Sequence, residues 1–186
     1  MQLLKRRYNE IEQTVLKLFS IVKVRKFPIS CFDICRQLGV KLYPYTTLSE
    51  KKRKAALKES KDGFYMIVEL SPNVFEYRIY YNDTMPRERI RFTIMHELGH
   101  IMLDHTEHSI LAEIEANYFA GYALAPPPIV GQIGIADFME LADRFDISQE
   151  CALYAMRRYI KWLQYGSPYL LGHEQELLVI FEPLLQ

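Results

Sequence analysis

The segment His96-Glu97-Leu98-Gly99-His100 constrains the chain more than any other, because its H-E-x-x-H spacing becomes functional only on a helix. Residues four apart lie one turn apart on a helix, so the two imidazoles can reach the same zinc ion. Apolar residues keep a helical period through the motif, at Ile90, Ile94, Leu98, Ile101 and Met102. We therefore predict a helix that begins near Pro86 and carries both histidines on one face.

Glu97 occupies the place of a general base in such a site. It follows the first histidine directly and can accept a proton from a zinc-bound water without binding the ion itself. Gly99 costs about 1 kcal/mol in a helix interior, which indicates either a close neighbour or a requirement of the metal site. The alternative interpretation is an amphipathic helix whose two histidines and glutamate face solvent.

A catalytic zinc ion takes three protein ligands and leaves a fourth position for water. The next predicted helix, from Ser109 to about Ala125, offers Glu113 and Glu115. Glu113 shares its helix face with residues that let two helices approach closely, namely Ala116, Asn117, Ala120 and Gly121. Glu115 shares its face with aromatic residues, namely Tyr118, Phe119 and Tyr122. We predict Glu113 as the third ligand, with Glu115 as the alternative, and Asn117 as a residue that orients an imidazole.

The remaining segments predict an α+β chain. Two β-rich runs, residues 63–70 and 74–81, flank the turn sequence Ser71-Pro72-Asn73 and predict a hairpin. Residues 40–45 predict a further strand, and three prolines at 126–128 should end the helix that carries Glu113. Four more helices are expected, at residues 3–24, 30–39, 136–145 and 148–165. The C-terminal tail contains an apolar run at residues 177–181.

Charge is balanced overall but not along the chain. The 23 Lys and Arg residues equal the 23 Asp and Glu residues, so the whole chain lacks the basic excess of a nucleic-acid-binding protein. Residues 1–61 contain 15 basic residues against 5 acidic ones, and the remainder is correspondingly acidic. The run Lys51-Lys52-Arg53-Lys54 predicts an exposed loop or a helix start.

Cysteine content and hydropathy indicate a cytoplasmic protein. Cys31, Cys35 and Cys151 are too few for a disulfide framework and are typical of a reducing compartment. The N-terminal residues lack the apolar core of a signal peptide, and no stretch approaches the 18 or so apolar residues of a membrane span. We expect no membrane association.

Residues 136–165 offer a second interpretation, because two helices joined by a tight turn resemble a helix-turn-helix. The first helix and the turn carry one basic residue, Arg144, against five acidic ones: Asp137, Glu140, Asp143, Asp146 and Glu150. This surplus has the wrong sign for a phosphate backbone. The pair is therefore interpreted as two helices packing together, with DNA binding as the minor alternative.

Several segments together resemble the ImmA/IrrE family of metallopeptidases. They are Arg91–His100, Glu113–Ala120 and Ala123–Pro126, with further similarity in Tyr81-Asn82 and in residues 30–40. The resemblance covers about residues 28–160. It implies a zincin-like α+β fold, in which a small, mostly antiparallel sheet packs against the motif helix and further helices follow. By this resemblance His96, His100 and Glu113 match the Zn²⁺ ligands, and Glu97 matches the catalytic base.

The resemblance also implies a function. Members of the family typically cleave a helix-turn-helix repressor, often of a mobile genetic element or a stress pathway. A zinc-dependent endopeptidase with a protein substrate, and without direct nucleic-acid binding, is therefore expected. We expect one domain over residues 1–186, with an N-terminal helix (1–27), a family-like core (28–165) and a C-terminal tail (166–186). The alternative is a zinc-binding regulator that binds a repressor without cutting it.

Peptide hydrolysis needs a donor to the tetrahedral oxyanion beside the metal. His105, His108, His173 and the tyrosines are the candidates, and the sequence does not choose among them. Strand 74–81 precedes the motif helix and is a candidate edge along which a substrate binds.

Overall fold

The structure is a computed structural model that describes residues 3–166 and 169–181. It divides into two compact units. Ser30–Ala120 form one, here called the sheet unit, and Met1–Ile29 with Gly121–Gln186 form the other, here called the helical unit. The predicted organisation as one domain over residues 1–186 is not tested by this division and stays a prediction.

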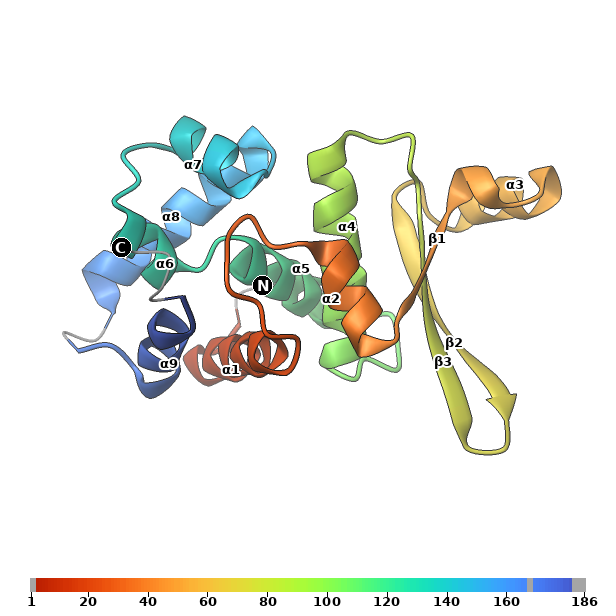
Figure 1. Cartoon of the computed structure of the whole chain (residues 1–186), viewed down its shortest axis with the longest axis horizontal. Helices are drawn as coiled ribbons and strands as arrows, with labels where there is room; N and C mark the ends of the chain where they lie inside the picture. The colour runs from red at the N-terminus through yellow and green to blue at the C-terminus, as the bar shows by residue number, and fades with distance from the viewer. Residues whose placement is uncertain (1–2, 167–168, 182–186) are drawn as a thin grey trace. The chain divides into compact units, whose positions relative to one another are not determined.

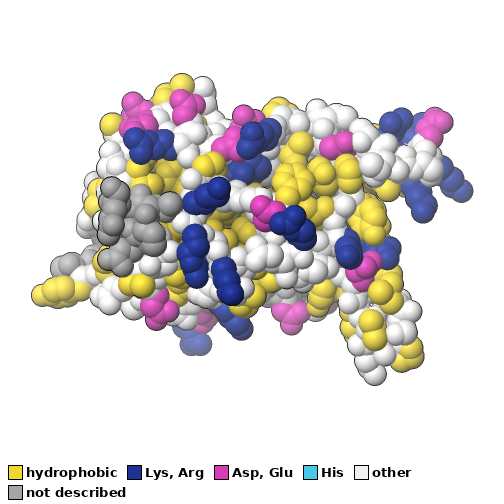
Figure 2. Space-filling model, in the orientation of Figure 1, with side chains coloured by type: hydrophobic (Ala, Val, Ile, Leu, Met, Phe, Trp, Pro, Cys, Tyr) yellow, Lys and Arg dark blue, Asp and Glu magenta, His cyan; other side chains and the backbone are white. Residues whose placement is uncertain are grey.

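The sheet unit contains both helices of the predicted metal site (Figure 1). In chain order its elements are α2 (Cys31–Leu38), β1 (Lys41–Pro44), the 3-10 helix η1 (Tyr45–Thr47), α3 (Glu50–Glu59), β2 (Gly63–Ser71), β3 (Val74–Tyr81), α4 (Arg87–Met102) and most of α5 (Ile110–Leu124). The predicted α+β class is confirmed. The basic run 51–54 lies in the first turns of α3, where its side chains are exposed, and Figure 2 shows them gathered in dark blue over that helix.

Local chemistry accounts for the ends of α2. The Ser30 hydroxyl accepts a hydrogen bond from the backbone N–H of Asp33, as a helix N-cap does. Gly39 ends the helix with φ 74°, a left-handed conformation that glycine adopts without the steric cost of a Cβ. The two residues thus mark the ends of the helix that the sequence predicts at residues 30–39.

The three strands form a mixed sheet in the order β1-β3-β2. β2 and β3 are the predicted antiparallel hairpin, and β1 adds to β3 in parallel. β3 is therefore the central strand over residues 78–81, where β1 covers its second edge, so the predicted substrate edge cannot include these residues. Residues 74–77 are paired with β2 and lie beyond the register of β1. Ile79 and Tyr81 of β3 are buried, and α4 packs on β2 and β3. The predicted packing of the sheet against the motif helix is confirmed.

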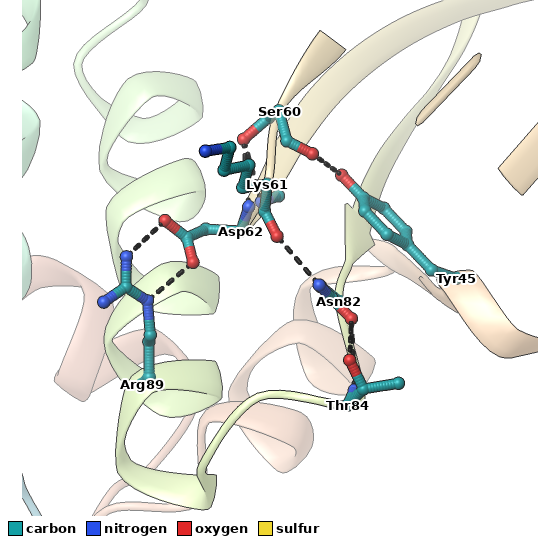
Figure 3. A network of polar contacts seen from close by, with 8 residues as sticks. Tyr45, Ser60, Lys61, Asp62, Asn82, Thr84 and Arg89 are labelled. Carbon is teal, nitrogen blue, oxygen red and sulfur yellow. Dashed lines mark hydrogen bonds and ion pairs between the residues drawn. The ribbon is translucent and has the colours of Figure 1, made fainter. Parts of the chain in front are cut away.

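A polar network ties the start of β2 and the end of β3 to the first turn of α4 (Figure 3). Arg89 of α4 donates two hydrogen bonds of 2.6 Å to the Asp62 carboxylate. The Asn82 amide donates to the carbonyl of Lys61 at 2.9 Å, and the Tyr45 hydroxyl donates to that of Ser60 at 3.2 Å. The bonds between Arg89 and Asp62 hold the first turn of α4, which precedes the motif histidines, against the start of β2. The other two bonds fix the residues before β2 to the end of β3 and to η1.

The helical unit contains α1 (Lys5–Ile21), α6 (Pro127–Ile133), α7 (Phe138–Phe145), α8 (Gln149–Tyr165), α9 (Gly172–Phe181) and the last turn of α5. The prolines end α5 as predicted, but Pro127 and Pro128 then begin α6, which the sequence analysis missed. A proline at a first helical position gives up an N–H that has no intrahelical partner. α9 covers residues where only an apolar run was expected. None of the helices in the described ranges has the length and apolar character that crossing a membrane demands.

Aromatic side chains from three parts of the chain pack in the core of the helical unit. The Phe27 ring lies 5.0 Å from that of Phe145 and 4.7 Å from that of Phe181, measured between ring centroids. Phe19 of α1 meets Phe181 edge to face at 5.8 Å. The apolar run near the C-terminus therefore contributes Leu177 and Phe181 to this core, whereas Val179 of the same run is exposed.

A buried ion pair joins α1 and α9 in the same unit. Nε2 of His173 lies 2.9 Å from Oε2 of Glu12, and the two side chains are 7% and 12% exposed. The hydrogen bond with Glu12 raises the pKa of His173 above its ordinary value. Because the folded pKa exceeds the unfolded one, the pair stabilises the fold fully below about pH 6.5 and loses that contribution as the pH rises through the raised pKa.

We predict that Glu12→Gln lowers the free energy of unfolding by about 1–3 kcal/mol at acidic pH, because it removes the charge that faces His173. The difference from the wild type should shrink as the pH is raised from about 5.5 to about 9. Urea unfolding of both proteins across this range measures it. Glu10→Gln, on the exposed side of the same helix, is the matched control and should change stability little. An equal loss at both ends of the pH range would contradict the prediction.

Candidate metal centre

The motif side chains of α4 lie in the interior of the sheet unit. Ile94, Met95 and Leu98 are fully buried, and Glu97 and His100 are buried beside them. The side chain of His96 is 14% exposed. The motif therefore does not form a solvent-facing polar stripe. Polar groups this deep in the fold need specific partners.

The three predicted ligands converge. Nε2 of His96 lies 3.1 Å from Nε2 of His100. The two Glu113 oxygens lie 3.3 Å from the Nε2 of His96 and 3.4 Å from that of His100, respectively. A tetrahedral zinc ion with bonds of about 2.0–2.1 Å separates its ligand atoms by about 3.3–3.4 Å. In the described part of the chain these are the residues that group as metal-binding donors, and both their chemistry and their spacing fit zinc.

Glu115, the alternative third ligand, points elsewhere. Its Oε2 accepts a hydrogen bond from Nε2 of His105 at 3.0 Å, and the residue is buried. Gly99 explains how α4 and α5 approach: a Cβ at this position would lie 3.0 Å from the Phe119 ring. The close neighbour that the glycine indicated is therefore Phe119, and the small residue that permits the contact lies on α4.

Each imidazole has a partner at its second nitrogen. Nδ1 of His96 lies 3.2 Å from the amide oxygen of Asn117, in agreement with the role predicted for that residue. Nδ1 of His100 lies 2.9 Å from Nδ1 of His105. The ring of Tyr65 stacks on His100 with a centroid distance of 5.6 Å, and its hydroxyl donates to the backbone carbonyl of His105 at 2.6 Å.

Sequence reasoning did not single out Tyr65, and it left the role of His105 open among the candidates near the motif. A signal for His105 exists, because it stands five residues after His100 and just beyond the end of α4. No local signal distinguishes Tyr65 from the other tyrosines, since only strand pairing brings it to the site.

Burial sets the charge states of the site. It raises the pKa of Glu97 to about 7, with a further contribution from the Glu113 carboxylate, while the backbone N–H of Tyr65 acts in the opposite direction. Burial also lowers the pKa of His96, and it lowers that of His100 to about 4. Both histidines therefore favour the neutral imidazole, which is the form that binds metal. A bound dication would lower the pKa of the Glu97 carboxyl group in turn.

The candidate oxyanion donors are partly occupied. His105 contacts His100 and Glu115, and His173 pairs with Glu12 in the helical unit. His108 is exposed. The Tyr65 hydroxyl already donates to a backbone carbonyl. That a side chain donates a hydrogen bond to the oxyanion stays a prediction, and no residue is assigned to this role.

Comparison with known protein families finds one matching family model. It is that of the M78 peptidases, described as the IrrE N-terminal-like domain, and it matches residues 35–157. The matched range contains all of α4 and α5, and thus the whole candidate centre. No curated protein matches the chain.

We predict that Glu113→Gln weakens zinc binding by more than about 100-fold, because loss of a ligand exceeds the 10–100-fold that loss of an outer hydrogen-bond partner costs. The side chain is 48% exposed, so the fold should tolerate the change. Competition with a chromogenic chelator measures the affinity, and Glu107→Gln at an exposed position is the matched control. Unchanged affinity in Glu113→Gln together with loss in Glu115→Ala would identify Glu115 as the ligand instead.

Proposed function

The chain belongs to the IrrE N-terminal-like family of M78 peptidases, and on that premise we propose that it is a zinc-dependent endopeptidase acting on a protein. The observation that carries the proposal is the convergence of two imidazoles and the Glu113 carboxylate next to the buried Glu97. A purely structural zinc site normally closes with four protein ligands. Three ligand residues group here within the described ranges, and an acid that is no ligand stands beside them.

The residues of the site have separate tasks in this proposal. His96, His100 and Glu113 would hold the zinc ion, which when bound would lower the pKa of water towards about 7 and polarise the scissile carbonyl. Glu97 accepts a proton from the attacking water as the new C–O bond forms. It then donates this proton to the leaving amine as the C–N bond breaks. The backbone N–H of Tyr65 holds the Glu97 carboxylate throughout.

The proposed substrate is a helix-turn-helix repressor of a mobile genetic element or a stress pathway, as in members of the family. A cytoplasmic location agrees with the free thiols of Cys31, Cys35 and Cys151. Direct DNA binding by α7 and α8 is disfavoured, because the acidic surplus at residues 136–150 would repel a phosphate backbone.

We predict that Glu97→Gln lowers cleavage by about 10²–10⁴-fold and leaves zinc bound, because it removes the base and keeps every ligand. The test is co-expression with the helix-turn-helix repressor encoded nearest the gene, followed by the intact mass of the repressor and the zinc content of the purified protein. Glu107→Gln exchanges an exposed carboxyl group for an amide in the same way and should cleave like the wild type.

The outcomes separate the alternatives. A defined fragment that appears with the wild type and Glu107→Gln, but not with Glu97→Gln, supports the peptidase. An intact repressor that co-purifies with all three forms supports the regulator that binds without cutting. A repressor that is neither bound nor cut would contradict the proposed substrate.

A further inference from the structure

We propose that His105 and Glu115 are positioning residues for the metal ligand His100, which they hold through a hydrogen-bonded relay that ends on a buried carboxylate. The inference rests on the metal site of the proposed function. It concerns how tightly that site binds its ion rather than which bond is cleaved.

The end of α4 brings His105 to His100. The backbone N–H of His105 donates to the carbonyl of His100 at 3.0 Å, and that of Asp104 donates to Ile101 at 3.2 Å. Asp104 adopts φ 55° between them. These features define a Schellman motif, in which the side chains at its first and last positions commonly make an apolar contact. Here both positions are histidine, so the motif places two imidazoles in hydrogen-bond contact.

The proton positions along the relay follow from its ends. Nε2 of His100 faces His96 and Glu113, so its lone pair must point to the metal site and its proton must lie on Nδ1. Nδ1–H of His100 then donates to Nδ1 of His105. The proton of His105 consequently lies on Nε2 and is donated to the Glu115 carboxylate. These contacts are mutually compatible, because no atom is required to act as donor and acceptor at once.

Burial makes this relay effective. The side chains of His100, His105 and Glu115 are 4%, 10% and 6% exposed. Hydrogen bonds strengthen in such surroundings, and a carboxylate behind an imidazole both fixes its orientation and raises its basicity as a ligand. Tyr65 closes the arrangement, because its ring stacks on His100 while its hydroxyl binds the carbonyl of His105.

The second histidine ligand is held differently. Nδ1 of His96 faces the neutral amide oxygen of Asn117, which lies at an exposed position, at 3.2 Å. A neutral partner open to solvent polarises an imidazole less than a buried carboxylate does. The structure therefore assigns His100 as the more firmly anchored of the two imidazole ligands.

The first test replaces His105 by Phe, which keeps an aromatic ring and removes both nitrogens. We expect zinc affinity, measured by competition with a chromogenic chelator, to fall by about 10–100-fold. Glu115→Gln retains an acceptor oxygen without the charge and should lose less. His108→Phe, at an exposed position on the same loop, is the matched control and should bind zinc like the wild type.

A second readout separates positioning from a general loss of stability. The visible absorption bands of the Co²⁺-substituted protein report on ligand geometry, and they should shift in His105→Phe but not in His108→Phe. A weaker affinity with unchanged bands would assign His105 a merely structural role and overturn the proposal.

A third comparison leaves every member of the relay intact. Asp104→Gly favours the left-handed conformation that the Schellman motif requires, so zinc affinity should be retained. Asp104→Val disfavours that conformation and should weaken zinc binding although it touches no ligand. If His105→Phe fails to fold, the comparison of Asp104→Gly with Asp104→Val tests the proposal instead. Equal zinc affinities of these two variants would then overturn it.

Failure of the relay and failure of the proposed function give different results. If the wild type binds zinc and Glu113→Gln does not, while His105→Phe matches the wild type in affinity and in Co²⁺ bands, the relay is wrong and the metal site stands. If the wild type binds no zinc, the proposed function itself fails.

Discussion

The contact between Gly99 and Phe119 is the constraint on which the metal centre depends. A Cβ at position 99 would lie 3.0 Å from the Phe119 ring, so the glycine lets the two helices that carry the ligands approach without displacing that ring. Glu113 lies on α5 with Phe119, and the distances of 3.3 Å and 3.4 Å between its carboxylate oxygens and the histidine Nε2 atoms depend on that approach. A glycine that is unfavourable for an isolated helix thus favours the close approach of the two helices at the site.

The surroundings of the three ligands are unequal. His100 is nearly inaccessible and backed by buried groups, whereas the Glu113 side chain is 48% exposed. The site therefore combines an anchored interior side with an open side, as expected of a centre that must bind its ion and still admit a substrate. Glu97 belongs to the interior side, where burial raises its pKa and a backbone N–H holds its carboxyl group.

Much of the fold follows from local patterns. Each of these patterns acts within a few residues: Ser30 and Gly39 at the two ends of α2, the turn before Val74, and the spacing of apolar residues along α4. The corresponding elements have the predicted type. α6 was missed, because the three prolines signal the end of one helix as readily as the start of the next. The order of the strands in the sheet could not be predicted from the sequence either. Nothing in residues 74–81 alone indicates that β1 will pair beside them and make β3 central.

The sequence by itself determined which groups share a helix turn. The spacing of His96 and His100 places both imidazoles on one face, because α-helical geometry is the same in every helix. The left-handed Asp104 that turns His105 back to His100 is one of several ways in which a helix can end, so the sequence alone did not determine that contact. Only the tertiary structure decided between Glu113 and Glu115 and brought Tyr65 to His100, because these contacts arise when separate elements pack together. A pattern along one segment cannot specify a partner on another, because that partner is fixed only when the segments pack together.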